Sequence, residues 1–207
     1  MHRIRTLIQQ GEHDQLDFKQ EISSAIKIAK TMVSFANHKG GRLLVGVRDN
    51  GAIAGVRTED EKYMLETASA FYCKPEIAIE IKEWDIEGKT VLEVIIPNGA
   101  DKPYSALSDD KKWWVYIRVK DKSLLASKVV VDVLRSSQSQ RDVLIEYGHN
   151  ERSLIEYLKI NDRITIQGFC KLVNISRRRA NRILVKLIGA GVLRSHQTEK
   201  FEHYTLT

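Results

Sequence analysis

Two periods of apolar residues alternate along the first 138 residues. A spacing of three and four predicts amphipathic helices, whereas alternating or short continuous apolar runs bounded by turn residues predict strands. Helices are therefore expected at residues 20–37, 58–72 and 127–136, and strands at 42–48, 52–56, 77–84, 90–96 and 113–119. This mixture predicts an α+β domain over residues 1–138, in which a mixed sheet is flanked by helices.

Turn residues set the limits of several elements. Gly40 is expected to end the first helix in the left-handed conformation, and Pro75 follows the end of the second. Asn50-Gly51 predicts a type I′ hairpin, because both central residues of that turn need positive φ. Asp49 then lies at the edge of a tight turn, directly after a strand that we expect to be covered on both faces.

The strand at 113–119 has two chemically different rows. Trp113 and the valine and isoleucine positions that follow it at alternate places form an apolar row. An aromatic and basic row is formed by Trp114, Tyr116, Arg118 and Lys120. This row either meets a ligand or packs under a helix.

The pattern changes after about residue 150. Three short helical patterns precede two strand-like segments around a polar tip, and Ser176 is placed to cap the third helix. Three helices and a two-stranded wing predict a winged helix-turn-helix domain over residues 150–207. Residues 139–149 then form the linker.

The positive charge lies almost entirely in this last segment. The chain has a net charge of +6, and residues 150–207 hold eleven Lys and Arg against five Asp and Glu, whereas residues 1–149 hold 22 of each. A basic block of this kind is typical of a protein that contacts a phosphate backbone.

Four arginines crowd the start of the third C-terminal helix: Arg177, Arg178, Arg179 and Arg182. Cations at the positive end of a helix dipole cost roughly 0.3 to 1 kcal/mol each when exposed, so stability alone would favour acids there. The start of the second helix in this motif reaches bases and phosphates in the major groove. We therefore expect these arginines to bind nucleic acid, with Lys200 in the wing as a weaker backbone contact; an acidic protein surface is the alternative partner.

Three groups of residues carry a resemblance to a known family. Together they resemble the Schlafen-type, AlbA-like domain family labelled DNA-binding. The groups are the segment from Glu12 to Lys19, the cluster Phe35-Ala-Asn37 with Gly40-Gly41, and Gly46-Val-Arg-Asp49. Lys102-Pro103 and Tyr116-Ile-Arg118, later in the chain, support the resemblance. The resemblance covers residues of about 5 to 135. It implies an AlbA-like fold, with a winged helix as a frequent companion.

The same resemblance implies an alternative activity. In Schlafen proteins that cleave tRNA, three acids fall on Glu12, Asp17 and Asp49, and a lysine falls on Lys19. These carboxylates would hold Mg²⁺ or Mn²⁺, and Lys19 would stabilise the transition state, as a metal-dependent endoribonuclease requires. The family usually has Glu where this chain has Asp17, and the competing interpretation is that Asp17 and Lys19 form structural ion pairs while Asp49 begins the turn.

Composition limits the remaining classes. No run approaches the roughly 18 apolar residues of a membrane span, so we expect a soluble, cytoplasmic protein with no membrane partner. Cys73 and Cys170 indicate neither a disulfide framework nor a zinc site. The leading hypothesis is a DNA-binding transcriptional regulator, and the alternative is the metal-dependent endoribonuclease. RNA is the other nucleic acid that the protein could bind, and a homodimer is one expected assembly.

Overall fold

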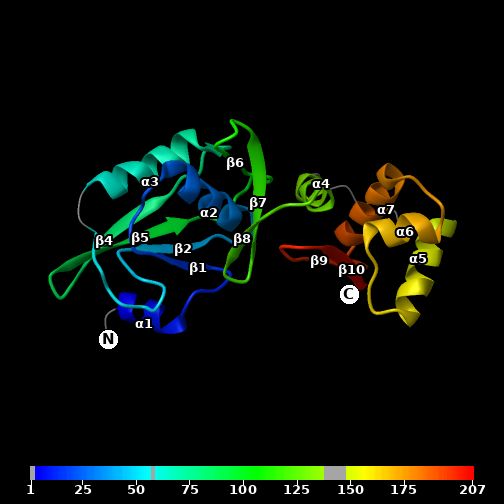
Figure 1. The fold of residues 1–207 in the computed structure, drawn as a ribbon, viewed down its shortest axis with the longest axis horizontal. Helices are drawn as coiled ribbons and strands as arrows, with labels where there is room; N and C mark the ends of the chain where they lie inside the picture. The colour runs from blue at the N-terminus through cyan, green and yellow to red at the C-terminus, as the bar shows by residue number, and fades with distance from the viewer. Residues whose placement is uncertain (1–2, 57–58, 138–147) are drawn as a thin grey trace. The chain divides into compact units, whose positions relative to one another are not determined.

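A computed structural model describes residues 3–56, 59–137 and 148–207 of the chain (Figure 1). Contacts between Cα atoms divide the chain into two compact units, Met1–Leu125 and Ala126–Thr207. Over the described residues, no helix has both the length and the apolar character needed to cross a membrane.

Over its described residues, the first unit combines three helices with two four-stranded sheets. One sheet is mixed, because β1 runs parallel to β2 and its other pairs are antiparallel. Its strand order is β1-β2-β5-β4, and the second sheet has the order β3-β6-β7-β8. The elements are α1 (Arg3–Gln10), β1 (Leu16–Lys19), α2 (Ala25–Asn37), β2 (Gly41–Val45), α3 (Asp60–Phe71), β3 (Cys73–Lys74), β4 (Glu80–Ile86), β5 (Lys89–Ile96), β6 (Ser105–Leu107), β7 (Trp113–Val119) and β8 (Lys122–Leu125). The expected α+β class with a mixed sheet and flanking helices is confirmed.

Helices cover both faces of the mixed sheet, with α2 and α3 on one side and α1 on the other (Figure 1). Leu43 and Val45 of β2 join the core under α2, whereas Leu44 between them joins the core under α1. This alternation follows from the two-residue period of a strand. The expected burial of the strand on both faces is therefore confirmed for residues 43–45.

The glycine pair after α2 is explained by packing. Gly40 has φ of +73°, and a Cβ there would lie 2.7 Å from the backbone nitrogen of Asn98. A Cβ on Gly41 would lie 2.4 Å from Cδ1 of Phe35. Both positions therefore need glycine so that the chain can pass from α2 into β2 at close range.

The turn after β2 differs from the expectation. Gly51 has φ of +81°, but Asn50 has no positive φ, so the turn is not type I′. The amide of Gly51 donates to the carbonyl of Arg48 at 2.8 Å, and the amide of Arg48 donates to Ala52 at 2.9 Å. This three-residue hairpin ends in a left-handed glycine, and the expected return strand is reduced to one isolated bridge at Ile53.

The two rows of β7 also differ from the expectation. Trp113, at the head of the row expected to be apolar core, is 42% exposed, whereas Arg118 in the other row is 5% exposed. Tyr116 packs on the core around α2, and the guanidinium carbon of Arg118 lies 4.6 Å from the ring centroid of Phe35. The interpretation that this row packs under a helix is thus correct for Tyr116 and Arg118.

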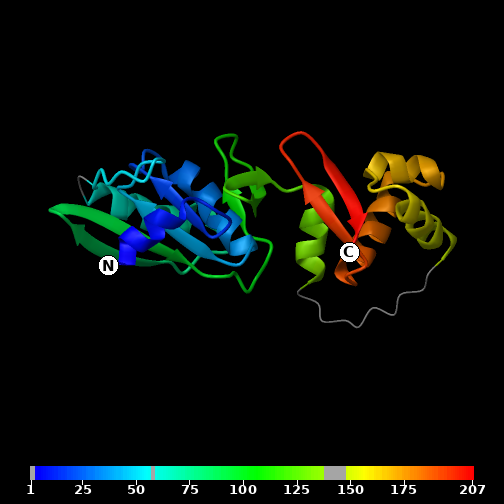
Figure 2. The same cartoon turned by 90° about the horizontal axis from the view of Figure 1, so that it is seen from below.

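In the described residues of the second unit, four helices pack with an antiparallel hairpin. Figure 2 shows these elements from a second side. The core of this unit is built from apolar residues of all these elements, with Phe169 and Tyr204 fully buried. The elements are α4 (Lys128–Ser136), α5 (His149–Ile160), α6 (Ile166–Leu172), α7 (Arg177–Gly189), β9 (Leu193–Gln197) and β10 (Glu202–Leu206). The three helices and the antiparallel hairpin expected after residue 150 are all present.

The position of α4 corrects the expected domain boundary. We expected this helix to close a first domain ending at residue 138, but the contacts place it in the second unit, which starts at Ala126. The physical reason is that Val129 is buried in the second core and Val133 packs against it. Most of the expected linker, residues 139–149, lies outside the described residues.

Candidate nucleic-acid interface

Helix α7 carries the arginine cluster, and its N-cap and its apolar side hold the helix in place. The hydroxyl of Ser176 accepts a hydrogen bond from the backbone amide of Arg179 at 3.3 Å, so Ser176 is the N-cap that the sequence predicted. The apolar side of the helix is anchored in the second core by Ala180, Ile183, Leu184 and Leu187. Capping and packing together fix the direction in which the opposite side faces.

All four arginines of the cluster are exposed. Within the described part of the chain, none of the guanidinium groups of Arg177, Arg178, Arg179 and Arg182 forms an ion pair or a side-chain hydrogen bond. The first turn of α7 also contains no acidic residue. The helix therefore keeps an uncompensated positive charge at the positive end of its dipole.

The helical period shows that the cluster extends further than the sequence analysis proposed. Arg178 and Arg182 are four residues apart, and Lys186 continues the same row by another four. Arg179 is exposed beside this row. These four residues form a basic stripe along α7, and Lys186 could have been found by continuing the four-residue spacing.

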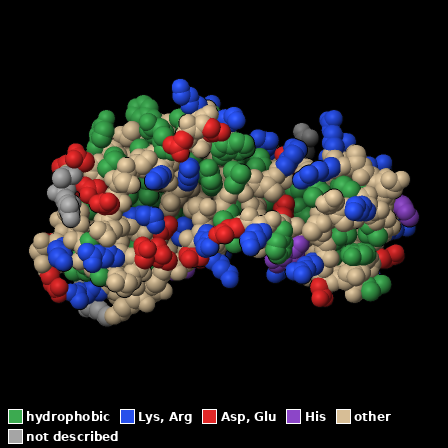
Figure 3. Space-filling model, viewed as in Figure 1, with side chains coloured by type: hydrophobic (Ala, Val, Ile, Leu, Met, Phe, Trp, Pro, Cys, Tyr) green, Lys and Arg blue, Asp and Glu red, His purple; other side chains and the backbone are tan. Residues whose placement is uncertain are grey.

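Helix α4 supports the other flank of α7. Asn181 Nδ2 donates to Asp132 Oδ2 at 2.7 Å, and Lys128 Nζ lies 3.1 Å from the same oxygen. The packing of α4 therefore leaves the basic stripe open while fixing the side of α7 that bears Asn181. In the face shown in Figure 3, Lys and Arg side chains outnumber acidic ones over this unit.

The hairpin contributes fewer cations. Lys200 is exposed at the tip between β9 and β10, as expected for a weak backbone contact. His196 and His203 lie directly opposite each other, with ring centroids 5.0 Å apart. Burial lowers the pKa of His203, and the neighbouring His196 and Arg163 lower it further, so this histidine adds little positive charge at neutral pH.

The acidic residues near the N-terminus are held as structural ion pairs. Asp17 lies on β1 and is 4% exposed. Its Oδ2 accepts from Arg118 Nη1 at 2.9 Å, and its Oδ1 accepts from Lys19 Nζ at 2.7 Å. Both carboxylate oxygens are therefore already neutralised by cations of the chain itself.

Glu12 adjoins this pair. Its Oε1 accepts from the backbone amide of Phe18 at 2.9 Å. Burial raises the pKa of Glu12, and a hydrogen bond with Asp17 raises it further. Burial alone would also raise the pKa of Asp17, but the hydrogen bond with Glu12 and the charges of Lys19 and Arg118 outweigh it and lower that pKa. A protonated Glu12 can thus donate to an ionised Asp17.

Asp49 is not part of this cluster. It is exposed in the turn after β2. Within the described ranges, which include Glu12, Asp17 and Asp49, no group of three His, Cys, Asp or Glu side chains could hold a metal ion. Asp17 is instead paired with Lys19 and Arg118, so the structure does not bring the three carboxylates together as a metal-binding group, and the metal-dependent nuclease stays a prediction.

The family model described as Schlafen, AlbA_2 matches residues 12–127, more than half of the chain. The chain belongs to this family. The match ends close to Leu125, where the first unit ends, so the Schlafen AlbA_2 assignment concerns that unit.

Two solved structures match the chain at low sequence identity. The DIP2311 protein of Corynebacterium diphtheriae is 20% identical, with a TM-score of 0.48, over 62% of this chain and 28% of that one. The N-terminal domain of a RecG-related protein of Nitrosomonas europaea is 21% identical, with a TM-score of 0.44, over 72% and 98% of the two chains. The chain therefore spans well under two thirds of the Corynebacterium protein. A search of curated proteins found no match.

Within the Schlafen AlbA_2 unit, the motif residue Asn37 has a structural role. Its Nδ2 donates to the carbonyls of Tyr104 and Tyr116, both at 2.8 Å, and its Oδ1 accepts from the amide of Tyr104 at 2.8 Å. Asn37 is 5% exposed and joins the end of α2 to β7 and to the segment before β6. Together with Asp17 and Arg118, it shows that the residues behind the resemblance build the fold.

Proposed function

We propose that this protein binds nucleic acid through the basic stripe of α7, and that it acts as a DNA-binding transcriptional regulator. In this proposal the elements α5, α6, α7, β9 and β10 form a winged helix-turn-helix that reads duplex DNA. The Schlafen AlbA_2 unit before it belongs to a family labelled DNA-binding, which supports the same class of ligand.

One observation carries the proposal: the arginines at the start of α7 are exposed and unpaired within the described residues. Four cations without partners, at the positive end of a helix, cost stability unless a polyanion binds there. A helix that presents its N-terminal residues to a major groove contacts bases and phosphates with those residues. Arg178, Arg179 and Arg182 are the expected contacts, Arg177 flanks them, and Lys200 adds a backbone contact from the hairpin.

The test compares two triple variants that remove the same charge. Arg178, Arg179 and Arg182 are replaced by Ala in one variant, and the exposed residues Arg152, Lys159 and Lys171 of α5 and α6 are replaced by Ala in the other. Affinity for a mixed-sequence DNA duplex is measured by fluorescence anisotropy at moderate salt. The proposal expects the first variant to lose duplex binding and the second to keep most of it.

Equal losses in the two triple variants would mean that only net charge matters, and the α7 interface would then be refuted. Running the same titration with duplex RNA decides the preference between DNA and RNA. The expected homodimer is a separate prediction, and the molar mass measured by light scattering checks it with and without duplex.

A further inference from the structure

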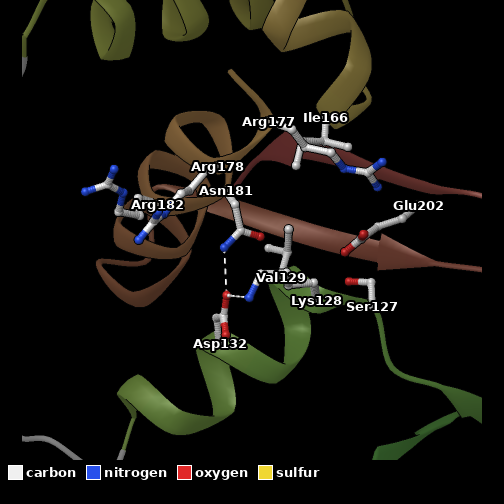
Figure 4. Close-up of a pocket in the computed structure, with 10 residues that line it drawn as sticks. All are labelled: Ser127, Lys128, Val129, Asp132, Ile166, Arg177, Arg178, Asn181, Arg182 and Glu202. Carbon is white, nitrogen blue, oxygen red and sulfur yellow. Dashed lines mark hydrogen bonds and ion pairs between the residues drawn. The ribbon is translucent and has the colours of Figure 1, made fainter. Parts of the chain in front are cut away.

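A pocket of about 610 Å³ lies in the second unit, where the N-terminal turns of α4 and α7 meet the hairpin (Figure 4). Val129 of α4 and Ile166 of α6 supply its apolar surface, and Glu202 of β10 lies at its far side. This volume is within the range of pockets that hold small organic ligands.

A buried amide oxygen points to a ligand. Asn181 is 6% exposed, and its Nδ2 donates to Asp132, but its Oδ1 is buried and has no hydrogen-bond partner. Figure 4 shows this oxygen on the opposite side of the amide from Asp132, toward the pocket. A buried acceptor without a donor is destabilising, so a bound molecule that donates a hydrogen bond to it would remove this cost.

The pocket also contains unpaired cations. Arg177, Arg178 and Arg182 line it, and their guanidinium groups have no partner within the described residues. The acid nearest to them on α4, Asp132, is already bonded to Lys128 and Asn181. The arginines and the N-terminus of α7 therefore favour an anionic group, and an arginine fork matches a phosphate well.

Glu202 adds a second acceptor at the far side. Its Oε1 accepts from the hydroxyl of Ser195 at 2.8 Å, which leaves the carboxylate with capacity for a further donor such as a sugar hydroxyl. Because Asn181 Oδ1 is itself enclosed, a ligand reaches it by displacing neighbouring side chains.

We propose that this pocket binds a nucleoside monophosphate, with the phosphate on the arginines and the base between Val129 and Ile166. The base donates a hydrogen bond to Asn181, and a sugar hydroxyl donates to Glu202. The ligand shares Arg178 and Arg182 with the proposed duplex interface. It therefore competes with duplex DNA and acts as a small-molecule regulator of it; this second step rests on the proposed function. Thermodynamic linkage requires that duplex weakens nucleotide binding by the same factor.

The pocket is tested on the full chain without nucleic acid, by calorimetric titration with AMP and, separately, with inorganic phosphate. AMP is expected to saturate one site and to bind at least about tenfold more tightly than phosphate. Asn181→Leu is expected to weaken AMP about tenfold, because it removes the acceptor. The matched control Asn161→Leu changes an asparagine on the C-terminal end of α5 and leaves AMP affinity unchanged.

A second variant keeps the test valid if loss of the bond to Asp132 unfolds Asn181→Leu. Ile166→Trp fills the pocket without replacing an arginine, so it is expected to abolish AMP binding while duplex affinity is retained. Equal binding of AMP and phosphate, no saturation by AMP, or unchanged AMP affinity in Ile166→Trp would each overturn the pocket.

The competition is measured last, as duplex affinity with and without saturating AMP. AMP binding without any effect on a functioning duplex interface would overturn the regulation alone. Loss of duplex binding in the control triple variant would refute the proposed function and leave the AMP result standing.

Discussion

Removal of Arg118 is the most informative perturbation of the Schlafen AlbA_2 unit. Its side chain is 1% exposed, and Arg118 Nη1 holds the 5% exposed carboxylate of Asp17 at 2.9 Å. The pair joins β7 of the second sheet to β1 at the edge of the first. Arg118→Met keeps an unbranched side chain of similar length over Phe35 but leaves Asp17 without its buried partner.

The magnitude follows from what remains around Asp17. Loss of one member of a buried ion pair costs about 3–5 kcal/mol, because the other charge stays buried without compensation. Lys19 still contacts Asp17 Oδ1 at 2.7 Å and its side chain is 39% exposed, which limits the loss. The carbonyl of His13 also loses a donor at 3.2 Å. We therefore expect a loss of about 3 kcal/mol in the free energy of unfolding.

Urea unfolding monitored by tryptophan fluorescence measures this directly. The three tryptophans of the sequence, Trp84, Trp113 and Trp114, all lie in the first unit, so the signal reports that unit by itself. The double variant Asp17→Asn with Arg118→Met should be more stable than Arg118→Met alone, since it no longer buries an unpaired charge.

Arg48→Met provides the matched control, because Arg48 is exposed. Its free energy of unfolding is expected to stay within about 0.5 kcal/mol of the wild type. If Arg118→Met lowers the free energy of unfolding by less than about 1 kcal/mol, the argument is refuted, because removing one member of a buried ion pair should cost more than that.

The same pair predicts a pH dependence with a definite sign. Burial tends to raise the pKa of Asp17, but the hydrogen bond with Glu12 and the charges of Lys19 and Arg118 outweigh burial. The pKa is therefore lowered from its ordinary value of 3.8. The ionised form of Asp17 therefore contributes stability that is fully present above pH 3.8 and is lost as pH falls through the lowered pKa. The stability gap between the wild type and Asp17→Asn should narrow below about pH 4; a gap that widens on acidification would contradict the assignment.

Three further outcomes are expected from the first unit. Asn37→Ala should lower the free energy of unfolding by about 2–4 kcal/mol, because three buried backbone groups lose their partner, and urea unfolding measures it; a neutral result would mean that water replaces the amide. Gly41→Ala should cost about 1–3 kcal/mol by the same assay, because its Cβ would overlap Phe35. Millimolar Mn²⁺ should leave the midpoint of thermal unfolding unchanged, both in the wild type and in Asp49→Ala. A midpoint that Mn²⁺ raises only in the wild type would support metal binding by the acidic residues.

Long periodic elements could be predicted from the sequence, and short ones could not. The helices α2 and α7 hold 13 residues each, so their three-to-four spacing repeats often enough to be read, and Ser176 marks the start of α7. Strands β1, β3, β6 and β8 have only two to four residues, which is too few for a period to show. We did not predict helix α1 either.

Partners in space were harder to predict than elements. The apolar side of α4 contains Val129 and Val133, but nothing in that pattern says which core they join. The alternation along β7 left open whether its aromatic and basic row meets a ligand or packs under a helix. Arg118 is buried because Asp17 lies opposite it on a strand about a hundred residues earlier. The arginine cluster was predictable because its residues are neighbours in sequence, and the pocket beside it was not, because α4, α6, α7 and β10 build it together.

The salt dependence of duplex binding tests the central claim most directly. The logarithm of the binding constant falls linearly with the logarithm of the salt concentration, with a slope of about −0.9 for each phosphate contact. If the stripe on α7 binds the phosphate backbone, replacement of Arg178, Arg179 and Arg182 by Ala should make the slope shallower by up to about 2.7. A variant that binds duplex with the wild-type slope would contradict the account.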